Sequence, residues 1–303
     1  MNPTSDSLFH FTRHLKVFKL ILERGLRYSF SFEQFQEAVI SNIFTSGCFT
    51  DISDDDYDMY RGIAIPMVSF CDIPLLRIGT HSKKYGRYAI GLDKRALSSL
   101  YDDFINPVVY ADSRVFYRSF KYVSGSQGQT IKLVALVRLL KAENPDIERQ
   151  LKSVDIDTKA KEYSFELNQC IHTLASLFKP TYGKDVYGKE VCFYDEHEWR
   201  AIQPNFPKSE FEWEIGITRD RFLSIKDELN MALDNSPEAF LKIPNDMFNA
   251  VTNIIVPTEK IARSIIKFIF TNEKLLGSTN IALEQRLSLI SKVTSFERIF
   301  SNY

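Results

Sequence analysis

Several common sequence features are missing from this chain of 303 residues. No stretch approaches the ~20 consecutive apolar residues that a membrane span needs, so we expect no membrane contact. The first sixteen residues lack a basic region followed by an apolar run, so we expect no signal peptide. The formal net charge is only -1. Any nucleic-acid contact must therefore come from a local basic patch, because no global field would attract a polyanion.

Closely spaced cysteines are also missing. The chain has four cysteines, Cys48, Cys71, Cys170 and Cys192, and no two of them form a CxxC pair. Disulfide scaffolds and zinc ribbons space their cysteines tightly. We therefore expect reduced thiols and a cytoplasmic protein.

The glycine-rich and catalytic motifs of several large enzyme classes do not occur. "SGSQGQ", residues 124–129, matches neither GxGxxG nor GxxxxGK[ST], and the sequence holds no GxSxG or HExxH. These absences exclude Rossmann and P-loop fingerprints and the common hydrolase, kinase and zincin motifs.

The apolar residues that are present predict strands and helices in an irregular order. Alternation predicts a strand over residues 8–12, "LFHFT", and helical spacing predicts a helix from about residue 14 to Gly25. Ser31 with Gln34 resembles a capping box, which predicts a second helix through about Ile40. Further strands are expected at 63–71, in "GRYAIGLDK", in "INPVVYA" and in "EHEWRAI", the last paired with "FEWEIGI".

Helical periodicity returns in two later regions. Amphipathic patterns predict a helical insertion at about 130–180. "NIIVPTEKIARSIIKFIF" predicts a strand, a turn and a helix capped by Thr258, and a last helix is expected from Leu283 to Phe300. We therefore predict an α+β fold in a single domain, residues 1–303, with a C-terminal helical segment at about 258–303.

Two possible metal sites have weak patterns. The acidic loop with Asp51, Asp54, Asp55, Asp56 and Asp58 lacks the glycine and terminal glutamate of a calcium loop. Cys71, His81, Cys192 and His197 suit zinc by residue type, but their spacing matches no ligand pattern. We therefore predict no metal site and treat the acidic loop as solvated.

The segment "YDEHEWR", residues 194–200, offers paired carboxylates. On a strand, Glu196 and Glu198 point to the same side with Arg200 in line. Like charges repel, so both stay ionised only if they are exposed or meet a cation or a polyhydroxyl ligand. Such a pair suits cleavage of a glycosidic bond, with Glu198 stabilising an oxocarbenium-like transition state and Glu196 orienting the acceptor. The alternative is a solvated strand face without catalytic function.

Several of these segments together resemble a known family. "MVSFCDIPL", His81, "YGRYAIGLDK", "NPVVY" and "YDEHEWR" are similar to the AbiGi family of bacterial phage-resistance proteins. The opening "LFHFT" with "ILERGL" resembles both that family and the DarT-type ADP-ribosyltransferases.

The transferase resemblance implies a split β-sheet that clamps NAD as substrate. It places His10, with Thr12 on the same strand face, against the NAD ribose. Ser69 or Tyr88 is the middle-strand residue, and Glu198 is the catalytic glutamate with Glu196 guiding the acceptor. The sequence leaves open which of Ser69 and Tyr88 faces the cleft.

Two functions follow from these resemblances. The first is a phage-defence effector that transfers ADP-ribose from NAD to a macromolecule. Nucleic acid is one such acceptor, which Lys83, Lys84 and Arg87 in "HSKKYGR" would hold. The alternative is a non-catalytic antitoxin of a two-gene abortive-infection system, because AbiGi proteins have been labelled antitoxins. Either function implies a cognate toxin or antitoxin partner.

Overall fold

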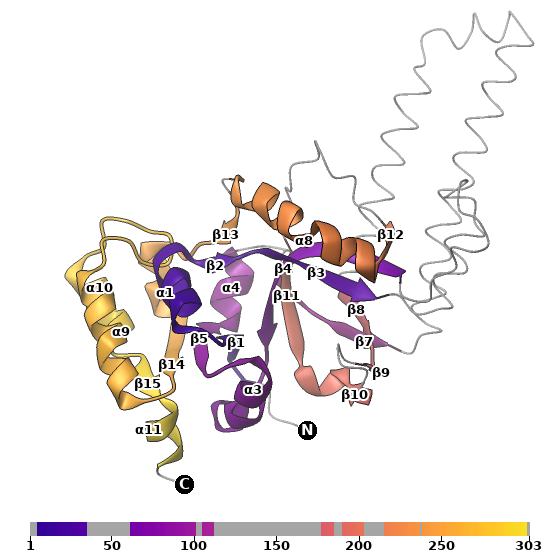
Figure 1. Ribbon diagram of the computed structural model, residues 1–303. Coiled ribbons are helices and arrows are strands. Elements are labelled where there is room, and N and C mark those ends of the chain that lie inside the picture. Colours follow the sequence, from indigo (N-terminus) through magenta and orange to yellow (C-terminus); the bar gives the residue numbers. More distant parts are fainter. Residues whose placement is uncertain are drawn as a thin grey trace, which may run out of the picture.

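A nine-stranded, mostly antiparallel sheet forms the centre of the computed structural model (Figure 1). The model describes residues 5–34, 61–100, 105–111, 177–184, 190–202, 215–236 and 238–301. Seven strands follow the order β15-β14-β5-β1-β4-β11-β6, and β3 and β12 pair with β4 beyond this path. The strands of the sheet are β1 (Ser7–Thr12), β3 (Ser29–Gln34), β4 (Arg61–Cys71), β5 (Tyr88–Asp93), β6 (Ile105–Pro107), β11 (Glu198–Ile202), β12 (Ile215–Thr218), β14 (Val251–Val256) and β15 (Val293–Ser295).

Short paired strands and helices surround this sheet. The pairs are β2 (Leu26–Arg27) with β13 (Phe240–Leu241), β7 (Val109–Ala111) with β8 (Phe178–Pro180), and β9 (Tyr182–Lys184) with β10 (Glu190–Cys192). The helices are α1 (Leu15–Arg24), α3 (Ile78–Tyr85), α4 (Lys94–Leu100), α8 (Arg219–Asp234), α9 (Glu259–Thr271), α10 (Leu283–Ile290) and α11 (Phe296–Phe300), with 3-10 turns η2 (Leu75–Arg77), η3 (Phe193–Glu196) and η4 (Asn245–Ala250). Among the described residues, no helix is long and apolar enough to span a membrane.

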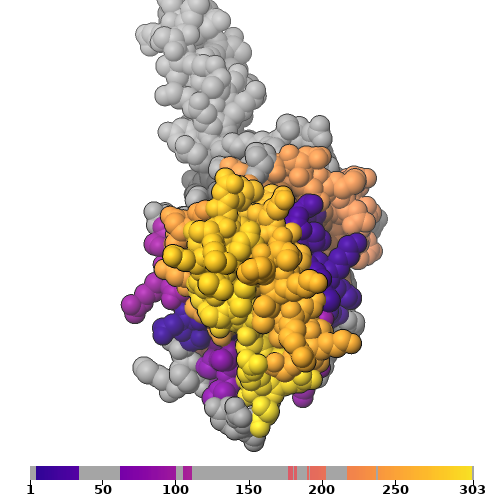
Figure 2. Space-filling model, turned by 90° about the vertical axis from the view of Figure 1, so that its left-hand side faces the viewer, coloured from indigo at the N-terminus to yellow at the C-terminus, as the bar shows by residue number. Residues whose placement is uncertain are grey.

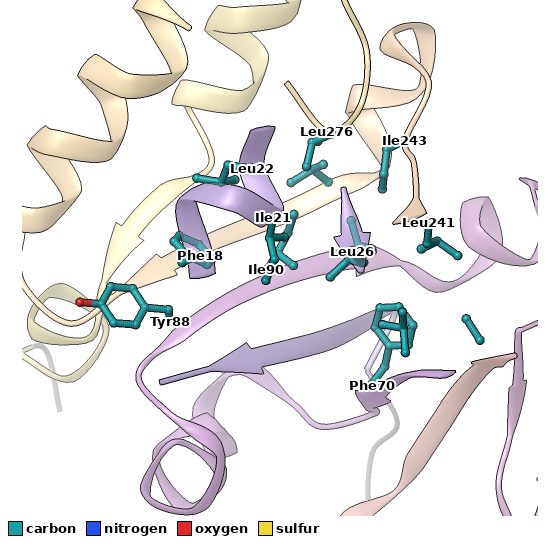
Figure 3. Close-up of a cluster of buried hydrophobic side chains, with 14 of the residues drawn as sticks. Phe18, Ile21, Leu22, Leu26, Phe70, Tyr88, Ile90, Leu241, Ile243 and Leu276 are labelled. Atoms are coloured by element: carbon teal, nitrogen blue, oxygen red, sulfur yellow. The ribbon is translucent and has the colours of Figure 1, made fainter. Parts of the chain in front are cut away.

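Each face of the sheet has its own apolar core. The larger core lies under α1, α8 and α9 and contains Leu8, Phe70 and Ile90 from neighbouring strands (Figure 3). The smaller core, on the opposite face, joins Phe9 and Ala89 to Ile78 of α3 and Phe296 of α11. Because strand residues alternate between faces, the continuous buried run Tyr88–Leu92 in β5 identifies a central strand covered on both sides.

Most of the strands and helices expected near the N-terminus and in the middle of the chain are confirmed. β1 and β4 lie where alternation predicts them, and α1 ends at Gly25, whose φ of 96° is left-handed. A Cβ at Gly25 would lie 2.5 Å from the Leu241 carbonyl oxygen, so glycine also permits this close approach. Thr258 caps α9 by accepting a hydrogen bond from the Ile261 amide at 3.3 Å. The α+β class is therefore confirmed.

Three element predictions are wrong. Residues 29–34 form strand β3 paired with β4, not the start of a helix, because Phe30 and Phe32 alternate with polar residues and Phe32 packs on Phe222. β12 pairs with β4 instead of β11, since β4 has eleven residues and offers its first half to β12 and β3. The expected last helix is interrupted by β15, which pairs in parallel with β14 and buries Val293 and Ser295.

Two further predictions cannot be compared with the structure. The acidic loop at 50–60 lies outside the described residues, and so does the insertion at about 130–180 except for its end, where β8 begins. The single-domain boundary and the ADP-ribosyltransferase-like split of the sheet stay predictions.

The fold predicts that two phenylalanines contribute very differently to the free energy of unfolding. Phe70 has none of its surface exposed, whereas Phe270 on α9 is 55% exposed. We expect Phe70→Ala to lower the free energy of unfolding by about 3–5 kcal/mol, because it leaves a cavity in the larger core. The matched Phe270→Ala should change it by less than about 1 kcal/mol. Urea unfolding followed by circular dichroism measures both values, and equal losses would contradict the assigned burial.

Candidate functional site

The two glutamates of "YDEHEWR" lie on different elements. Glu196 ends the 3-10 turn η3, and Glu198 is the first residue of β11. His197 between them has a left-handed φ of 44°, and its amide donates to the Tyr194 carbonyl at 3.2 Å. The prediction that both carboxylates leave one strand on the same side is therefore wrong, because the turn breaks the alternation before Glu198.

Glu198 is buried and bound by two cations. Its Oε1 accepts from Nε of Arg200 at 3.0 Å, and its Oε2 accepts from the second guanidinium nitrogen, Nη2, at 3.3 Å. Nζ of Lys179 donates to the same Oε2 at 3.0 Å. Both carboxylate oxygens of Glu198 are thus occupied by side chains of the protein itself.

Arg200 links this pair to a third strand. Its side chain is completely buried, and Nη2 lies 3.0 Å from Oε1 of Glu33 on β3. Glu33, Glu198 and Arg200 share one face, because β3 and β11 both pair with β4 in register. A guanidinium stays charged in proteins, so these carboxylates supply the charge that its burial requires.

Lys179 brings the two glutamates together. Its Nζ lies 2.9 Å from Oε2 of Glu196 and 3.0 Å from Oε2 of Glu198. The same ammonium lies 4.5 Å from the centre of the Phe193 ring. Nothing in the sequence pattern around "LFKP" distinguishes this lysine from a surface residue, so Lys179 was not among the predicted site residues.

Glu196 is held from the other side by α3. Its Oε1 pairs with Nζ of Lys84 and accepts a hydrogen bond from the Tyr85 hydroxyl at 2.8 Å. The cation that was expected to keep two neighbouring carboxylates ionised is therefore supplied within the chain. We call Glu33, Lys179, Glu196, Glu198 and Arg200 the charge cluster.

Charge in this cluster shifts the pKa values of its members. Burial alone would raise the pKa of Glu198, but the charges and hydrogen bonds of Arg200 and then Lys179 outweigh it and lower this pKa from 4.5 to about 2. Burial alone would lower the pKa of Lys179, but the combined attraction of Glu198, Glu33 and Glu196 outweighs it and raises this pKa. Burial, with added repulsion from Glu198, raises the pKa of the Cys71 thiol to about 12. Glu196 and Glu198, whose pKa values are both lowered, are ionised at neutral pH, and the Cys71 thiol is protonated.

The predicted NAD-binding residues are divided between the two faces of the sheet. Cys71 of β4 pairs with Phe9 of β1 and with Glu198 of β11, so these three residues share one face of the sheet. Ser69 lies on the same face, is exposed, and pairs with Arg200. By alternation His10 lies on the other face, next to Phe70 with ring centres 6.0 Å apart.

Thr12 and Tyr88 lie on the His10 face as well, directly opposite one another on β1 and β5. Tyr88 is buried against Phe18 of α1, with ring centres 5.5 Å apart (Figure 3). The structure therefore brings Ser69 to the face of Glu198 and places His10, Thr12 and Tyr88 on the opposite face.

The zinc alternative gains no support from the described residues. Cys71 and Cys192 are free thiols there. In that part of the chain, no group of three or more His, Cys, Asp or Glu side chains is arranged to hold a metal ion.

The fold and the charge cluster together define an α+β protein in which charged side chains around a buried arginine pair with one another. The model of the family described as "Putative abortive phage resistance protein AbiGi, antitoxin" matches residues 41–236. This chain belongs to the AbiGi family.

One curated protein illustrates the relationship. The abortive phage resistance protein AbiGi of Lactococcus lactis subsp. cremoris is 24% identical over 247 residues, which cover 78% of this chain and 87% of the relative. No solved structure matches the chain.

The charge cluster predicts that neutralising Glu198 destabilises the fold. Glu198→Gln removes a buried negative charge beside Arg200 and Lys179, so we expect the free energy of unfolding to fall by about 3 kcal/mol. Glu196→Gln should cost less, since its partner Lys84 is exposed to water whereas Arg200 beside Glu198 is completely buried. Chemical denaturation of both variants checks the order, and an equal or larger loss for Glu196→Gln would contradict it.

The lowered pKa of Glu198 predicts a specific dependence on pH. Between about pH 5 and pH 2 the unfolded chain binds a proton at this residue and the folded chain does not, so stability decreases as pH falls through this window. Above pH 5 the contribution is fully present. The stability difference between wild type and Glu198→Gln should therefore be constant from pH 7 to 5 and shrink below pH 5. A difference that does not change down to pH 3 would show that Glu198 is not the responsible group.

Proposed function

We propose that this protein is the antitoxin of a two-gene abortive-infection system and acts by binding a partner toxin. The observation that carries this proposal is that every side-chain oxygen of Glu196 and Glu198 already has a partner within the chain. Arg200 and Lys179 occupy the oxygens of Glu198, and Lys84, Tyr85 and Lys179 occupy those of Glu196. A catalytic carboxylate must offer an oxygen to its substrate, and here a substrate would compete with these internal partners for the same oxygens.

The placement of the other predicted residues supports the same conclusion. A cleft that clamps NAD needs its first-strand residue and its glutamate within reach of one ribose. His10 and Glu198 belong to opposite faces of the sheet. The antitoxin description of the family agrees with a function that needs no catalysis.

Exposed apolar side chains offer a surface for such a partner. Leu283 and Leu287 lie one turn apart on α10 and are 58% and 50% exposed, and Phe270 of α9 is also exposed. Arg286 joins the two helices by donating to the Ile269 carbonyl at 2.7 Å. C-terminal residues, yellow and orange, make up most of the coloured surface on the side of the molecule that Figure 2 shows. Exposed apolar groups on a soluble protein favour a protein partner.

One observation favours a transferase as the second candidate. Ser69 is exposed on the face of Glu198, and β1 and β4 share only one backbone pair in the described residues, Phe9 with Cys71. His10 bridges these strands just beyond that pair, with Nδ1 2.9 Å from the Ser69 carbonyl oxygen. After Lys179 moves away from Glu198, a transferase would break the bond between nicotinamide and ribose in NAD, release nicotinamide and transfer ADP-ribose to a macromolecule. Turnover of NAD by the wild type, lost in a folded Glu198→Gln variant, would favour this candidate.

The antitoxin proposal predicts that α10 is needed for the complex. When the tagged protein is co-expressed with the product of its neighbouring gene, we expect co-purification and relief of that product's toxicity. Leu283→Asp with Leu287→Asp should weaken the complex at least tenfold, because charges would enter an apolar contact. Glu196→Gln should leave both results unchanged.

The matched control is Leu76→Asp, since Leu76 is 59% exposed on η2, away from α10. An equal effect of this variant, or no complex with the wild type, would reject the proposed interface. Toxicity of the chain when it is expressed alone would reject the antitoxin function itself.

A further inference from the structure

The end of β1 and the end of α3 meet although they are far apart in sequence. Nη2 of Arg13 donates to the Lys84 carbonyl at 2.8 Å. Gly86, which follows α3, has a left-handed φ of 118°, and a Cβ there would collide with the Thr12 carbonyl. Only glycine allows this approach, which places Arg13 beside the basic last turn of α3.

The two segments that meet here carry positive charge only. Residues 7–20 and 73–92 contain no aspartate or glutamate, and together they contain seven lysines and arginines. Arg13, Lys83, Lys84 and Arg87 surround the end of α3 and are all exposed. We call these four residues the basic surface.

Among the described residues, no carboxylate forms an ion pair with Arg13, Lys83 or Arg87. Lys84 pairs with Glu196, and Glu196 also pairs with Lys179. Asp195, the residue before Glu196 on η3, is exposed. Arg87 lies over the ring of Phe296 at 5.6 Å, and the neighbouring Glu297 accepts from the Glu259 amide at 2.8 Å. The positive charge of Arg13, Lys83 and Arg87 is thus available to a polyanion.

Aromatic rings border the basic surface on the face of Glu198. The ring centres of Phe11 and His81 lie 6.5 Å apart and those of His81 and Tyr85 6.1 Å apart, each pair at 27°. All three side chains are half-buried, so part of each ring stays accessible. Nδ1 of His81 is buried and has no hydrogen-bond partner in the part of the chain that the structure describes. Cations next to accessible rings suit a strand whose phosphates are charged and whose bases are unpaired.

We infer that the basic surface binds single-stranded nucleic acid, with Arg13, Lys83 and Arg87 contacting phosphates and the Phe11–His81–Tyr85 rings meeting an unpaired base. An acidic protein segment fits less well, since it would leave the accessible rings unused. This inference does not depend on the antitoxin proposal, because the exposed apolar residues of α9 and α10 assigned to the toxin lie on other elements.

The test measures binding of a fluorescent single strand of about twenty nucleotides, as DNA and as RNA, by anisotropy over a range of salt. For three phosphate contacts the logarithm of the association constant should fall with that of salt concentration with a slope of about -2. Lys83→Gln with Arg87→Gln should reduce the slope to about -1 and weaken binding about tenfold or more at low salt. The same sequence as a duplex should bind more weakly than the single strand.

The matched control is Arg263→Gln with Lys267→Gln, which removes the same charge from exposed positions of α9. It should leave affinity and slope unchanged, and both double variants should keep the wild-type melting temperature. Equal losses in the two variants, equal binding of duplex and single strand, or no binding at low salt would each overturn the inference. Loss of the toxin complex in Lys83→Gln with Arg87→Gln, without oligonucleotide binding by the wild type, would instead assign this surface to the protein partner.

Discussion

The buried positive charge of Arg200 determines which side chains must surround it in the charge cluster. Its side chain has no exposed surface, and a guanidinium cannot lose its proton to escape the cost of burial. Glu198 from its own strand and Glu33 from β3 pair with it and supply the opposite charge. Because β3 and β11 pair with different parts of β4, the contacts of Arg200 with Glu33 and Glu198 link these two strands through their side chains.

Opposite charges then alternate outward from Arg200. Glu198 attracts Lys179, Lys179 attracts Glu196, and Glu196 attracts Lys84 at the surface. Each carboxylate in this series lies between two cations, which lowers its pKa and leaves it little capacity to bind a further group. The glutamates that suggest a site for cleaving a glycosidic bond therefore form stabilising ion pairs in the fold. The family's antitoxin description is consistent with such a structural role.

Sequence patterns predicted the parts of this protein in which local periodicity and burial agree. β1, β4 and α1 follow their apolar spacing, and Thr258 and Gly25 mark helix ends by their local chemistry. The pattern failed at Ser31, where a capping-box spacing coincided with a strand whose phenylalanines pack on α8. Glu196 was misplaced because one left-handed residue, His197, is enough to end strand alternation. Lys179 could not be predicted, since its importance arises only from contacts with residues 17 and 19 positions away.

The position of β5 between β1 and β14 has a consequence for how the molecule is assembled during synthesis. β1 lies before residue 41 and β14 lies after residue 236, so both neighbours of β5 fall outside the segment that the family model matches. The matched segment by itself would leave both hydrogen-bonding edges of β5 open, and open edges invite pairing with other chains. On the ribosome, β5 has one neighbour early but acquires the second only after Val256 has emerged. The sheet is therefore completed late, and the growing chain exposes a strand edge throughout the synthesis of the residues between.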